Sequence, residues 1–122
     1  MNKGMNEKWI IKNDPFQIVA LAFDNLFPNT KYEAWFDPDI KDDEGNEKYG
    51  LTQFCDGEAP LILIWTKANF EVAIESFGHE LAHVAVGIEH EHDDAWEKAF
   101  DDIFVEYKRI GKEMFVKEEQ GK

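Results

Sequence analysis

Cysteine is almost absent from this chain, since Cys55 is the only one among 122 residues. A lone cysteine excludes an internal disulfide. The apolar runs, such as residues 61–65, are far shorter than the roughly 20 residues of a membrane-spanning helix. The first 14 residues contain no apolar segment of the length that a signal peptide needs. Together these absences predict a cytoplasmic protein that does not insert into membranes.

Basic residues are also scarce, because 13 Lys and Arg stand against 26 Asp and Glu, for a formal net charge of −13. A chain this acidic is repelled by phosphate backbones and anionic membrane surfaces. Nucleic acid and membranes are therefore not expected partners. The hydrophobic fraction of 43% and the aromatic fraction of 14% are sufficient for a modest core. We expect one domain covering residues 1–122, whose oligomeric state the sequence leaves open.

Capping residues and helical periodicity predict three helices. The first has Asp14 as its N-cap and Pro15 at the first helical position, and it ends before Pro28. The second begins after Asn69, carries apolar residues at helical spacing, and stops at Gly87. Both helices therefore present a broad apolar face for packing.

Strands are predicted at residues 32–36, 49–55 and 61–65. The last of these reads LILIW, a continuous apolar run rich in residues that favour strands. Such a run predicts a strand that is buried on both faces. The acidic segment 37–48 separates the first two strands and has the turn residues of a solvated loop.

The third helix is predicted to open with Asp94 and Glu97 as a capping box and to run to Gly111. The whole pattern predicts an α+β fold. It consists of an N-terminal helix, a short and mainly antiparallel sheet of about three strands, a central helix and a C-terminal helix.

The second predicted helix contains His79-Glu80-Leu81-Ala82-His83, which is the H-E-x-x-H pattern. Two histidines four residues apart lie one turn above each other on a helix, so both imidazoles can reach one metal ion. The intervening Glu80 lies close enough to take a proton from a water bound to that metal. The sequence therefore predicts zinc held by His79 and His83, with Glu80 as a general base.

A catalytic zinc ion takes three protein ligands and keeps one position open. Residues 88–96, IEHEHDDAW, follow the helix stop and offer several candidates. We select His92, because it precedes the last helix and Gly87 provides a bend that could return it to the metal. His90 and Glu97 are the alternatives.

An H-E-L-A-H helix followed by His92, four residues before the aromatic Trp96, resembles the SprT-like zinc metallopeptidases. The resemblance covers roughly residues 60 to 104. It implies a zincin-like domain in which a peptide pairs with an edge strand beside the active-site helix. The chain departs from the family at Asp93, where glycine is frequent, and it is strongly acidic where DNA-directed members carry basic regions. The resemblance thus supports the chemistry more than a role on DNA.

For the site, the resemblance implies zinc bound by His79, His83 and His92, with Glu80 as the general base of peptide-bond hydrolysis. The expected partner is a protein or peptide substrate. The alternative is a non-catalytic, zinc-stabilised interaction module, or an inactive metallopeptidase-like binding protein. Glu80 favours the enzyme, because a structural zinc site has no use for a carboxylate at that position.

Overall fold

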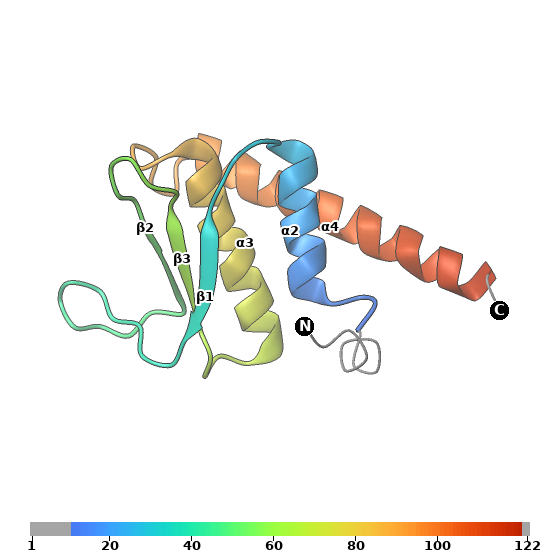
Figure 1. Cartoon of the computed structure of the whole chain (residues 1–122), viewed down its shortest axis with the longest axis horizontal. Helices are drawn as coiled ribbons and strands as arrows, with labels where there is room; N and C mark the ends of the chain where they lie inside the picture. The colour runs from blue at the N-terminus through green and yellow to red at the C-terminus, as the bar shows by residue number, and fades with distance from the viewer. Residues whose placement is uncertain (1–10, 121–122) are drawn as a thin grey trace.

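The computed structural model describes residues 11–120, with side chains described to residue 116, and folds them into three helices and a three-stranded sheet (Figure 1). This confirms the predicted α+β class. The elements in chain order are α2 (Pro15–Leu26), β1 (Glu33–Asp37), β2 (Gly50–Gln53), β3 (Leu61–Trp65), α3 (Phe70–Val86) and α4 (Asp94–Gln120).

The sheet is mixed, whereas the sequence predicted a mainly antiparallel one. Its strand order is β1-β3-β2, so the last strand in the chain lies in the centre. β3 pairs parallel to β1, with Glu33 opposite Leu61, and antiparallel to β2, with Gln53 opposite Leu61. The parallel pair arises because the chain reverses direction twice between β1 and β3. β2 is therefore an edge strand of the described sheet.

Only one face of β3 is fully buried, so the prediction of burial on both faces is wrong. Ile62 and Ile64 are 0% and 3% exposed and point toward the helices. Leu61, Leu63 and Trp65 point the other way and are half-buried. On that face apolar neighbours cover one another, as in the Tyr49–Trp65 ring pair, whose centroids lie 5.6 Å apart.

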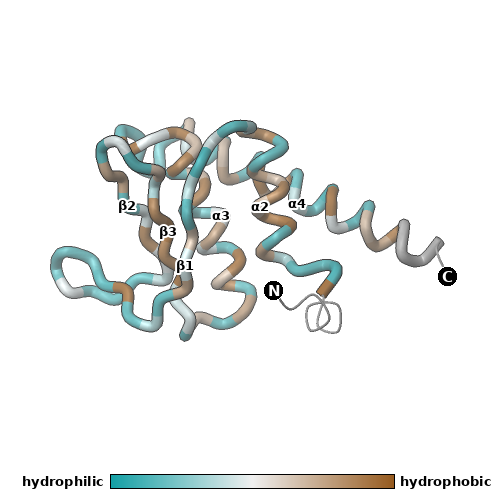
Figure 2. Tube along the Cα trace, in the orientation of Figure 1, coloured by the Kyte–Doolittle hydropathy of each residue, from teal (hydrophilic) through white to brown (hydrophobic). Residues whose placement is uncertain are grey.

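The helices pack on the other side of the sheet, with α3 against β2 and β3. α4 packs against both α3 and α2, and Figure 1 shows it crossing behind them. Hydrophobic residues concentrate on β3, α2 and α3 (Figure 2). The largest fully buried side chains come from every layer: Val19, Phe23, Ile62, Leu81 and Ile103. α3 therefore lies at the centre of the core.

The predicted ends of the first two helices are confirmed. The Asp14 carboxylate accepts a hydrogen bond from the Phe16 amide at 2.9 Å, and Asn69 accepts one from Val72 at 2.9 Å. Gly87 ends α3 with a φ of 90°, a conformation that glycine adopts without strain.

The predicted ends of the third helix are wrong at both termini. The capping side chain is Asp93, one residue earlier than predicted, and it accepts the Trp96 amide at 3.0 Å. The helix also continues through Gly111 to Gln120. One glycine costs a helix only about 1 kcal/mol relative to alanine, and the Arg109–Glu113 ion pair spans this turn at 2.7 Å. None of the helices within residues 11–120 combines the length and hydrophobicity needed to cross a membrane.

Candidate metal centre

Three histidines meet where the C-terminal half of α3 approaches the start of α4. His79 and His83 come from successive turns of α3, with ring centroids 5.1 Å apart. His92 comes from the loop between the helices and has a φ of 50°, a left-handed conformation that is uncommon outside glycine. Together with the bend at Gly87, this conformation turns the chain back so that His92 faces the two helical histidines.

The nitrogen atoms of the three rings converge. His92 Nε2 lies 3.0 Å from His79 Nε2 and 3.2 Å from His83 Nε2, and all three ligand atoms lie within 4.8 Å of one another. Zinc–nitrogen bonds of about 2.0–2.1 Å in a tetrahedral site place ligand nitrogens about 3.3 Å apart. The observed spacing therefore fits one small cation.

The protonation of these rings also suits a metal. Burial, reinforced by the neighbouring histidines, lowers the pKa of His79 from 6.5 to about 4. Burial and the charge of His92 lower the pKa of His83 as well. A neutral imidazole offers one nitrogen lone pair, and this is the form of histidine that binds a metal ion. One cation can accept a lone pair from each.

Of the three candidates for the third ligand, the structure brings His92 into the cluster. Within the described residues, the one group of three or more His, Cys, Asp or Glu side chains able to hold a metal is His79, His83 and His92. His90 instead pairs with Asp93, with 2.5 Å between Nδ1 and the carboxylate oxygen. Glu97 is exposed on the outer side of α4 beside Asp94 and Lys98.

Trp96 packs against all three histidines, a contact that was not predicted from the sequence. Its ring centroid lies 4.7 Å from that of His79, 5.6 Å from His83 and 4.6 Å from His92. Its indole N–H donates to the backbone oxygen of His79 at 3.2 Å, and its ring stacks on Phe100. The tryptophan thus forms an apolar wall that fixes the orientation of the imidazoles.

Glu80 lies beside this cluster and is the most buried acidic side chain there, with 9% of its side chain exposed. Its Oε2 is 3.9 Å from His79 Nε2, while its Oε1 accepts a hydrogen bond from the Thr52 hydroxyl at 2.7 Å. Burial raises the pKa of Glu80 from 4.5 to about 7, although the Thr52 bond opposes the rise. A carboxylate with this pKa can both take up and release a proton near neutral pH.

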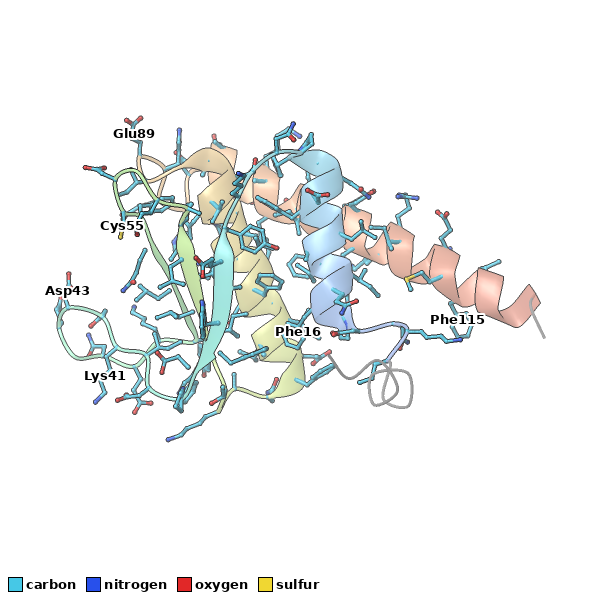
Figure 3. All side chains as sticks on the ribbon, in the orientation of Figure 1. Phe16, Lys41, Asp43, Cys55, Glu89 and Phe115 are labelled. Carbon is cyan, nitrogen blue, oxygen red and sulfur yellow. The ribbon has the colours of Figure 1, made fainter. Side chains whose placement is uncertain are left out.

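Figure 3 places the surrounding loops. Glu89, in the loop after α3, lies at the same end of the view as Cys55, in the turn between β2 and β3. Lys41 and Asp43, in the acidic loop between β1 and β2, lie at the opposite end of the strands. Because the histidine cluster lies toward the C-terminal end of α3, the acidic loop does not border it.

Comparisons of the chain with family models, with curated proteins and with solved structures find no match.

Proposed function

We propose that this chain is a zinc-dependent metallopeptidase. The observation that carries the proposal is the buried Glu80 carboxylate beside three converging histidines, two of which share its helix. A site that only binds metal for stability gains nothing from a buried acid at this position. The resemblance of the H-E-L-A-H helix and His92 to the SprT-like zinc metallopeptidases supports the same chemistry.

In this proposal His79, His83 and His92 hold the ion as neutral imidazoles. A zinc ion held there supplies a Lewis acid that polarises a peptide carbonyl and lowers the pKa of a bound water to about 7. His90 is held by Asp93, so it does not supply a fourth ligand. Three nitrogen ligands match the pattern of catalytic zinc sites, which leave one position open to water or substrate.

Glu80 takes the role of the general base. Its Oε2 is the oxygen nearer the histidines, and its other oxygen is occupied by Thr52. Oε2 accepts the proton of the attacking water and then donates it to the leaving amine. A single group can perform both transfers when its pKa lies near the working pH, which is where burial places Glu80.

The peptide substrate fits best along β2. This strand lies at the edge of the sheet, and its residues Gly50 and Thr52 contact Glu80. An extended peptide that adds to a sheet edge is held through its backbone, whatever its side chains are. A peptide paired with β2 would therefore pass next to the proposed base.

Zinc content and hydrolysis test the proposal separately. We expect elemental analysis to find about one zinc per chain after dialysis against metal-free buffer and zinc addition. His92→Ala should reduce retention of that zinc, and the matched His90→Ala should not. Loss of zinc in His90→Ala alone would assign the third ligand to His90.

Hydrolysis is then measured by digesting a peptide library with the zinc-loaded protein. Wild type should produce new peptide termini, while Glu80→Gln should keep zinc and lose turnover by about 10²-fold or more, as removal of a general base does. Zinc binding without turnover in wild type would reject the peptidase and support the zinc-stabilised interaction module. Absence of zinc binding would reject both.

A further inference from the structure

The Glu80 carboxylate rests against two residues on one face of β2, Gly50 and Thr52. Residues two apart in a strand point to the same side, and here that side faces α3. The Thr52 hydroxyl lies 2.7 Å from Glu80 Oε1 and 3.3 Å from the Glu80 backbone oxygen. One hydroxyl proton serves one strong bond, and the shorter contact is the one to the carboxylate.

This hydrogen bond determines which carboxylate oxygen faces the histidines. With Oε1 held by Thr52, Oε2 is the atom left toward His79, at 3.9 Å from its Nε2. Hydrogen bonds to a carboxylate are among the stronger ones in proteins, and at a buried site water does not replace them readily. Removing the hydroxyl would free the carboxylate to rotate about its last side-chain bonds.

Gly50 provides the space on the other side of the carboxylate. A Cβ placed on Gly50 would lie 3.0 Å from Glu80 Oε2 and 3.2 Å from Glu80 Cγ. Such a contact is tighter than ordinary packing, so an added methyl group would displace the glutamate side chain. Gly50 is not one of the described glycines that have a positive φ. Glycine is therefore favoured here by closeness to Glu80 rather than by backbone conformation.

We propose that Thr52 is the positioning residue of Glu80, and that Gly50 and Thr52 together hold its carboxylate with Oε2 directed at the metal centre. The catalytic effect of this positioning rests on the proposed function. The contact between β2 and α3 can be tested without any substrate. Both residues lie on the edge strand, so the strand proposed to receive the peptide also sets the orientation of the base.

The first experiment compares zinc-loaded Thr52→Val, which keeps the shape and loses the hydroxyl, with Thr52→Ser, which keeps the hydroxyl. We expect Thr52→Val to lower kcat about tenfold, the equivalent of one hydrogen bond, with KM and zinc affinity unchanged. Thr52→Ser should restore most of kcat. Thr66→Val removes a hydroxyl from an exposed threonine and serves as the matched control. Equal kcat for wild type and Thr52→Val would overturn the proposal.

The second experiment uses thermal unfolding of the full chain at a fixed excess of zinc. Thr52→Val should lower Tm when Glu80 is present, and it should have little effect in the Glu80→Met background, where no carboxylate needs a donor. Equal shifts in the two backgrounds would show that the two side chains are not coupled and would overturn the proposal.

The two experiments separate the two ideas. If wild type binds zinc without hydrolysing peptides, the proposed function fails, while the Tm shifts still decide whether Thr52 holds Glu80. If wild type hydrolyses peptides and Thr52→Val matches it, the proposed function stands and the role of Thr52 fails.

Discussion

Glu80→Gln is expected to stabilise the metal-free protein increasingly as the pH rises. Burial raises the pKa of Glu80 from 4.5 to about 7 in the folded protein. Between these values the folded state keeps a proton that the unfolded state has lost. The stability associated with the protonated group is thus complete below pH 4.5 and is lost as pH rises through 7. Glutamine cannot ionise, so the variant escapes this loss.

The structure sets the size of the effect. A difference of one pKa unit between the folded and unfolded states corresponds to about 1.4 kcal/mol. A pKa raised from 4.5 to about 7 therefore makes the ionised carboxylate destabilise the fold by about 3 kcal/mol. Only 9% of the side chain is exposed, so solvent screening reduces this value little. The free energy of unfolding of Glu80→Gln minus that of wild type should increase by about 3 kcal/mol between pH 4.5 and pH 8.

Urea unfolding in the presence of a chelator, followed by tryptophan fluorescence at pH 4.5, 6 and 8, measures this difference. The lowered pKa of His79 makes both proteins less stable as pH falls from 6.5 toward 4, and this shared effect cancels in the comparison. Zinc should shrink the pH-dependent gain, because a nearby cation favours the ionised carboxylate. A difference that stays constant from pH 4.5 to 8 would show that Glu80 ionises as freely in the fold as in water.

Two further changes test the packing around the site. Gly78→Ala would place a Cβ 2.2 Å from Phe104 Cε2, so we expect calorimetry to show a loss of about 1–3 kcal/mol. Gly111→Ala, also within a helix but with open space around it, should instead stabilise by about 0.5–1 kcal/mol. Equal effects would contradict the packing argument. Trp96→Phe removes the indole bond to the His79 backbone and should weaken zinc affinity about tenfold in chelator competition; unchanged affinity would refute the orienting role of Trp96.

The features predicted well from the sequence depend on residues close together in the chain. The caps at Asp14 and Asn69 act within three residues, and the stop at Gly87 depends on the glycine itself. The pairing of His79 with His83 follows from one turn of helix, so the prediction needed only a correct helix. These local signals were sufficient to predict three of the four residues of the candidate site, His79, Glu80 and His83.

The features predicted poorly depend on contacts between distant segments. Thr52 and Glu80 are 28 residues apart in the chain, and nothing in the sequence of residues 49–55 indicates that Thr52 contacts Glu80. The central position of β3 and its parallel pairing with β1 follow from how the strands assemble. The apolar run of β3 resembles a fully buried strand, yet Leu61, Leu63 and Trp65 lie on a face that no helix covers.

The identity of the third ligand depends on which residue caps α4. With Asp93 rather than Asp94 as the cap of α4, one carboxylate oxygen holds the Trp96 amide and the other holds His90. His92 is then the residue that turns toward α3, and Trp96 packs against it. Asp93 therefore holds His90 away from the cluster, while His92 faces His79 and His83. The position of this one cap thus decides which of the two loop histidines, His90 or His92, completes the cluster with His79 and His83.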